Sequence, residues 1–137
     1  MLIHFPAALF PMEFACAALG YYLGDNTFVF ASFYAMTGGV ILGWAAVTFG
    51  SLELLRVYKD NPRAINTAII HGSINSCVVI VYTVIAYSRY KSFPVFEPDG
   101  IALLALKAGI VHAMFLGNYF GGNLVLKYKV AIQNGNS

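Results

Sequence analysis

Three histidines and one glutamate stand inside long apolar stretches of this 137-residue chain: His4, Glu13, His71 and His112. An ionisable side chain inside a membrane span is costly, so each of the four is a candidate for function. Neutral imidazole is the commonest protein ligand of metals, and three histidines in such stretches suggest a metal or haem site. The sequence offers no compact set of four ligands, which argues against zinc.

Two of the histidines form the better pair for the axial positions of a b-type haem. His4 and His71 belong to the first and third apolar stretches, which can lie diagonally in a four-helix bundle. Their expected depths in the membrane differ by about one helical turn, whereas those of His71 and His112 differ by roughly 10–12 Å at about 1.5 Å per residue. Arg56 and Arg63 lie on the same side as the pair, where they would bind the haem propionates.

The other ionisable groups have a separate interpretation. Glu13 and His112 both lie near the middle of their stretches, and the first and fourth helices can be neighbours. A pair between them would neutralise two costly groups, and it could also serve as a proton relay or as an acid and base beside a quinone. Lys107 lies about two turns from the opposite side of the membrane. We interpret it as an anchor whose long side chain reaches the interface.

The composition identifies the class of protein that must position these residues. The chain is 59% hydrophobic and only 10% charged, with a net charge of +2, whereas average soluble domains carry about 25% charged residues. So few charges exclude an ordinary soluble enzyme, a nucleic-acid-binding protein and a disordered tail. The chain is therefore expected to be an integral membrane protein, folded as a single domain over residues 1–137.

The apolar stretches are each long enough for a membrane helix, which needs about 20 mostly apolar residues. They lack the alternation of polar and apolar residues that strands of a membrane barrel would show. Because the connections between them are short, neighbouring helices must run antiparallel. The sequence predicts an all-α, four-helix membrane bundle with up-down-up-down topology and spans over about 2–23, 28–53, 64–88 and 101–126.

The distribution of basic residues predicts the orientation. One side holds five lysines and arginines and the other holds two, and the cytoplasmic side of membrane proteins is the richer one. Both termini should therefore face the cytoplasm. Three Gly-x3-Gly patterns, which begin at Gly20, Gly39 and Gly117, would let helix backbones approach closely, and the sequence does not tell which of them forms an interface.

Three motifs carry a resemblance to a known family. They are the opening Ile3-His4-Phe5-Pro6-Ala7-Ala8-Leu9, the pattern Arg63-x7-His71-x3-Asn75, and Gly121-Gly122-Asn123-Leu124-Val125 near the end. Their order and positions resemble those of the bacterial membrane family called domain of unknown function 2231, over nearly the whole chain. The chain departs from that family at Glu13, where Asp is more common, and at His112, which has no counterpart there.

The resemblance implies a four-helix membrane domain, without an established activity, in the bacterial cytoplasmic membrane. Members resembling it are sometimes fused to Rieske iron–sulfur or c-type cytochrome domains, which implies membrane redox work and places the emphasis on His4 and His71. This is an argument by analogy rather than from a site.

Three functions are compatible with these observations. The first is a small b-type cytochrome, or a haem-bearing subunit of a membrane electron-transfer complex, which passes electrons between quinone and a partner without substrate chemistry of its own. The second is a haem-free structural subunit of a larger membrane complex, in which the histidines make interhelical hydrogen bonds, such as one from His71 to Asn75. The third is a proton-conducting or transport protein that uses Glu13 and His112. The expected partners are lipid and either other redox subunits or further copies of the chain.

Overall fold

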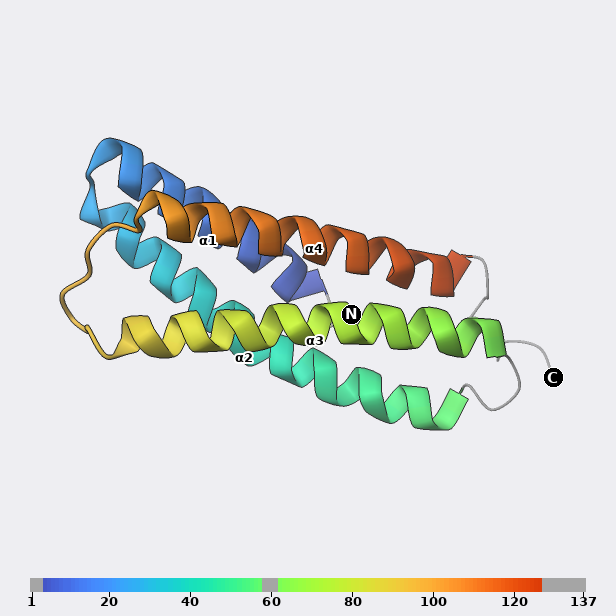
Figure 1. Ribbon diagram of the computed structural model, residues 1–137. Coiled ribbons are helices and arrows are strands. Elements are labelled where there is room, and N and C mark those ends of the chain that lie inside the picture. Colours follow the sequence, from blue (N-terminus) through green and yellow to red (C-terminus); the bar gives the residue numbers. More distant parts are fainter. Residues whose placement is uncertain (1–3, 58–61, 127–137) are drawn as a thin grey trace.

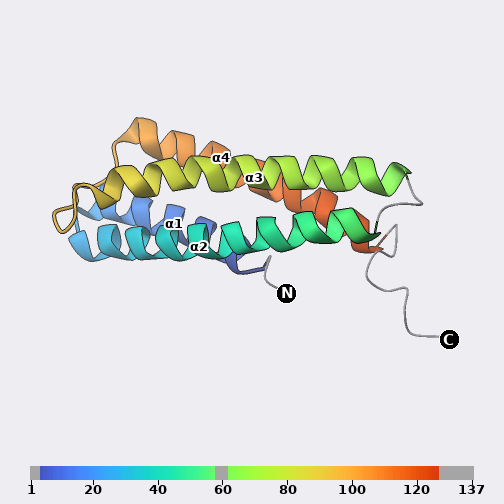
Figure 2. The same ribbon diagram turned by 90° about the horizontal axis from the view of Figure 1, so that it is seen from below.

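The computed structural model describes residues 4–57 and 62–126, and these residues form four antiparallel helices (Figure 1). Their bounds are α1 His4–Leu23, α2 Asn26–Val57, α3 Pro62–Tyr90 and α4 Ile101–Leu126. Each helix packs against the next one along the chain, and α4 also packs against α1, so the four form a closed bundle (Figure 2). The predicted all-α bundle with up-down-up-down topology is confirmed.

Three of the helices are long and apolar enough to cross a membrane. The segments are Asn26–Leu55 in α2, Ala64–Tyr90 in α3 and Ile101–Gly122 in α4. Among the described residues α1 is not one of these segments, and its 20 residues include Glu13 and Pro11. Many large apolar side chains lie on the outside of the bundle, among them Ile41, Leu55 and Leu116. Such an outer surface suits a lipid environment, in which apolar side chains need no cover of polar ones.

The two helices on one diagonal of the bundle meet through their side chains. The rings of Phe10 in α1 and Tyr82 in α3 are stacked, with centroids 4.1 Å apart and planes 4° from parallel. Both are fully buried, together with Met36 of α2 and Met114 of α4. Side chains from all four helices therefore form the core of the bundle.

A tight turn joins the first two helices. Gly24 ends α1 with a φ of 64°, a left-handed conformation that favours glycine at this position. Asp25 then caps α2, because its carboxylate accepts a hydrogen bond of 2.8 Å from the backbone N–H of Thr27. That hydrogen bond lowers the pKa of Asp25 below its ordinary value.

The longer connection, residues 91–100, folds back over the same end of the bundle. Phe96 is buried and its ring packs against those of Phe30 and Phe33 in α2. This anchoring brings Asp99, the last acidic residue before α4, into the protein interior, where it is 5% exposed. We call this end of the bundle, which holds the α1–α2 turn and residues 91–100, the loop end.

Candidate functional site

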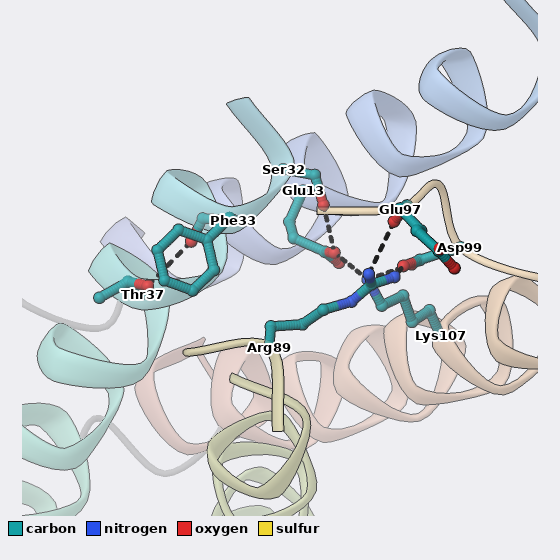
Figure 3. Close-up of polar contacts among 8 residues, drawn as sticks. All are labelled: Glu13, Ser32, Phe33, Thr37, Arg89, Glu97, Asp99 and Lys107. Atoms are coloured by element: carbon teal, nitrogen blue, oxygen red, sulfur yellow. Dashed lines mark hydrogen bonds and ion pairs between the residues drawn. The ribbon is translucent and has the colours of Figure 1, made fainter. Parts of the chain in front are cut away.

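A group of four charged side chains occupies the interior near the loop end (Figure 3). Glu13 comes from α1, Arg89 from the last turn of α3, Asp99 from the connection and Lys107 from the second turn of α4. Lys107 forms ion pairs with Glu13 and with Asp99, whose Oδ2 lies 2.5 Å from the lysine Nζ. Arg89 pairs with the other oxygen of Asp99. We refer to these four residues as the charge cluster.

The charge cluster is deeply buried and carries no net charge. Glu13 is 0% exposed, Lys107 1%, Asp99 5% and Arg89 18%. Two carboxylates and two cations compensate each other, which reduces the large cost of removing each charge from water. The gradient of exposure shows that Arg89 and Asp99 lie nearer to the outside than Lys107 and Glu13.

Neutral groups complete the surroundings of the charge cluster. Ser32 of α2 donates a hydrogen bond of 2.8 Å to Glu13 Oε1, and Arg89 donates one of 2.7 Å to the backbone carbonyl of Glu97. Three buried atoms of the described residues lack a hydrogen bond here: Glu13 Oε2, the hydroxyl of Tyr82, and Asp99 Oδ2, which has the Lys107 ammonium as its ion-pair partner. Buried polar atoms without a partner are uncommon and are often connected with function.

The interpretation of Lys107 as an interfacial anchor is wrong. Its side chain points into the bundle, because the Glu13 and Asp99 carboxylates offer the ammonium group two partners there. Arg89 and Asp99 lie outside the expected spans over 64–88 and 101–126, so the sequence alone does not pair them with Lys107. A useful signal was present nonetheless: Arg89, Asp99 and Lys107 all lie close to one end of the bundle and carry opposite charges.

The expected pair of Glu13 and His112 is not formed. Glu13 contacts Ser32 and Lys107, whereas His112 is exposed on the outer face of α4. The His112 Nδ1 makes a hydrogen bond of 2.7 Å with the carbonyl of Ala108, one turn earlier in the same helix. His112 therefore lies on the outer surface of the bundle and outside the charge cluster.

His71 lies further from the loop end, where α3 crosses α4. Its Nδ1 is 2.7 Å from the backbone carbonyl of Gly117, a distance that fits an Nδ1–H donor. Asn75 donates to the His71 carbonyl at 2.9 Å, and its amide also lies 3.1 Å from Nδ1. With the proton on Nδ1, the lone pair of the imidazole is on Nε2, the nitrogen that would then bind a metal.

Two glycines of α4 make room for this ring. A Cβ atom on Gly121 would lie 2.6 Å from Cε1 of His71, and one on Gly117 would lie 2.8 Å from the Asn75 amide nitrogen. Gly39 and Gly43 of α2 are similarly tight against Phe10 and Val79. Two of the three Gly-x3-Gly patterns thus have both glycines at contacts between helices.

Replacing Gly121 with alanine should lower the free energy of unfolding by about 1–3 kcal/mol, because the His71 ring must move away from the added methyl group. Gly122 is the matched control, since a Cβ there meets no atom within 4 Å. Gly122→Ala should be neutral or stabilising by up to about 1 kcal/mol, as for glycine in a helix. Unfolding of both purified variants in detergent by increasing SDS measures the difference, and equal stabilities would contradict the close fit.

For three other predicted site residues, the structure describes the position of the backbone but not of the side chain. His4 is the first residue of α1, and Arg56 and Arg63 lie in the last turn of α2 and the first turn of α3. Their side chains lie outside the described part of the structure. The helices α1 and α3 lie on one diagonal of the bundle, and the contacts of His4 and the two arginines stay predictions. In the described residues no group of three or more His, Cys, Asp or Glu side chains suits a metal ion.

The fold and the buried polar groups define an all-α membrane bundle with ionisable residues inside. The family described as predicted membrane protein (DUF2231) matches residues 1–134, so the chain belongs to this family and the resemblance of its motifs is confirmed. No curated protein and no solved structure matches the chain.

Proposed function

We propose that the chain is the membrane-embedded, haem-bearing subunit of an electron-transfer complex, with His71 as an axial ligand of a b-type haem. The observation that carries this proposal is the contact between His71 Nδ1 and the Gly117 carbonyl at 2.7 Å. Histidines that bind metals commonly donate their other ring N–H to a carbonyl or carboxylate, which fixes both the tautomer and the ring orientation. His71 has this partner within its own bundle.

The surroundings of His71 fit the role of a fixed ligand. Asn75 holds the backbone carbonyl of His71, and Gly121 allows the ring to lie directly against α4. A ring held on two sides would keep its orientation when the oxidation state of the iron changes. The haem, when bound, would supply one-electron chemistry, and the protein would set its potential through ligand orientation and burial.

His4 is proposed as the second ligand, and Arg56 and Arg63 as partners of the propionates. Support comes from the arrangement of the helices, since α1 and α3 lie on one diagonal and the two arginines belong to the end opposite the loop end. Quinone and other redox subunits are the proposed partners. The proposed location is the bacterial cytoplasmic membrane with both termini in the cytoplasm, because that side carries more lysines and arginines.

A haem-free accessory subunit is the second candidate, and the same histidine favours it. The contact of His71 with Gly117 joins α3 to α4, as an interhelical hydrogen bond would do in a purely structural protein. The two candidates differ in whether the Nε2 lone pair of His71 binds iron.

Titration of the detergent-purified chain with haem separates the candidates. The haem proposal predicts a saturable Soret band that is lost in His71→Ala and restored in part by added imidazole. His112→Ala is the matched control and should keep the band, because His112 lies on the outer face of α4. Circular dichroism and size-exclusion profiles check that His71→Ala is folded. An unchanged haem spectrum in folded His71→Ala would overturn the assignment of His71 as a ligand.

A further inference from the structure

The Glu13 carboxylate of the charge cluster has two hydroxyl groups near it, in addition to the Lys107 ammonium. Glu13 accepts a hydrogen bond from Ser32 on Oε1, and its Oε2 has no hydrogen bond in the described structure. The hydroxyl of Tyr82, also buried and without a hydrogen bond, lies beside the Glu13 carboxylate. Tyr82 is 0% exposed and is held in place by its stacking on Phe10.

Hydroxyl neighbours suit a carboxyl group that changes its protonation state. A hydroxyl both donates and accepts hydrogen bonds, whereas an ammonium or a backbone N–H only donates. When Glu13 is ionised, the Tyr82 O–H can donate to Oε2. When a proton sits on Oε2, it can be donated to the Tyr82 oxygen. Either contact requires the Tyr82 and Glu13 side chains, which are not hydrogen-bonded to each other in this structure, to come together.

The contacts of the charge cluster also connect Glu13 to the loop end. Arg89 is 18% exposed and holds Asp99, Asp99 contacts Lys107, and Lys107 contacts Glu13. A small cavity lies beside this chain of contacts, with Ser32, Arg89 and Asp99 in its wall, and its volume of about 10 Å³ is at the lower limit for holding one water molecule. The remaining wall is apolar.

We propose that the charge cluster is a proton-binding site, in which Asp99 admits a proton from the loop end and Glu13 stores it. The arrangement of two carboxylates on one ammonium group, with an amphoteric hydroxyl at the inner end, carries this inference. It is independent of whether the chain holds a haem, and it replaces the expected relay between Glu13 and His112.

The transfer uses contacts that already exist. Asp99 first takes up a proton from water at the loop end. The Lys107 ammonium then gives one proton to Glu13, and the neutral amine takes the proton from Asp99. Asp99 ends as a carboxylate, Lys107 as an ammonium and Glu13 as a carboxylic acid, so that one proton has moved inward and no other bond has changed.

The surrounding groups determine the charge of each state. Glu13 contacts Ser32 of α2 and Lys107 of α4. The other titratable groups that interact with its charge are Cys16 of its own helix and Tyr82 and Arg89 of α3, and Asp99 of the connection is one contact further on. The ionised charge cluster is neutral, and the loaded one carries one positive charge. Arg89 stays charged throughout, because guanidinium does not lose its proton in proteins.

Infrared difference spectroscopy during a pH titration tests the proposal on the purified protein without haem. Lowering the pH should produce the C=O stretching band of a buried carboxylic acid. The band should be absent in Glu13→Gln and present in Glu53→Gln, the matched control, because Glu53 is exposed on α2. After a rapid drop in pH, Asp99→Asn should form the band at least about tenfold more slowly, since the relay group at the entrance is removed.

A second variant keeps the test decisive where Glu13→Gln fails to fold. In Tyr82→Phe the band should shift, because the protonated Glu13 loses the hydroxyl that accepts its hydrogen bond. A band that persists in folded Glu13→Gln would overturn the proposal, and where Glu13→Gln does not fold, a band that is unchanged in Tyr82→Phe would overturn it. So would a Glu13 that stays ionised at every pH at which the wild-type protein is folded, since the charge cluster would then be a permanent structural ion pair.

Discussion

Replacing Lys107 with methionine is expected to lower the free energy of unfolding by about 3–5 kcal/mol, the cost of leaving a buried charge without its partner. Lys107 is the only residue of the charge cluster that contacts both Glu13 and Asp99. Its removal leaves the cluster with two carboxylates and one cation. Asp99 keeps its ion pair with Arg89, whereas Glu13 keeps the hydrogen bond from Ser32 but loses its ion pair.

Unfolding of detergent-purified protein by increasing SDS, followed by circular dichroism, measures this loss. Lys91→Met is the matched control, because Lys91 is exposed and its ammonium lies over the Tyr87 ring, 4.7 Å from the centroid. That contact should account for about 0.5–1 kcal/mol at most. The double variant Glu13→Gln/Lys107→Met restores neutrality and should recover part of the stability. If Lys107→Met and Lys91→Met were equally mild, the charge cluster would not hold the bundle together.

Truncation of Phe10 to alanine should also be strongly destabilising, by about 2–3 kcal/mol. In water-soluble cores the change from Phe to Ala costs about 3–5 kcal/mol, of which one part is the transfer of apolar surface and another is the cavity left behind. Lipid is as apolar as a protein core, so the first part is small for a membrane protein. The cavity part remains, because Phe10 fills the space between Tyr82 and Gly39.

Phe5→Ala serves as the comparison for Phe10→Ala in the same unfolding experiment. Phe5 belongs to the same helix and is 56% exposed, so its truncation leaves no enclosed cavity. A stability loss in Phe10→Ala that does not exceed the loss in Phe5→Ala would show that the stacked rings do not fix the position of α1 against α3.

The helices and their order could be predicted from sequence because each apolar stretch is long enough for one span and the connections are short. The predicted span over 64–88, for example, falls within α3, Pro62–Tyr90. The Gly-x3-Gly patterns indicate that some helix backbones approach closely, but the sequence does not tell that Gly117 and Gly121 are among the glycines that do so. The helices and their order depend on local sequence, which is why they could be predicted.

The charge cluster could not be predicted because it depends on the path of residues 91–100. Asp99 becomes buried only when Phe96 packs on Phe30 and Phe33, and nothing in the local sequence indicates that contact. The direction in which Lys107 points depends likewise on the rotation of α4 about its axis. The same limitation applies to His112. Its position near the middle of the fourth span predicts an interior side chain, whereas the structure places it on the outer face of α4.

The optical spectrum of the purified wild-type protein, expressed with ample haem and recorded before and after reduction with dithionite, tests the proposed function most directly. The proposal predicts a Soret band and, on reduction, the sharp α-band of a b-type haem with two histidine ligands. A colourless protein that remains folded, and that shows no such band after haem is added, would contradict it. The contact of His71 with Gly117 would then be a structural bond between α3 and α4.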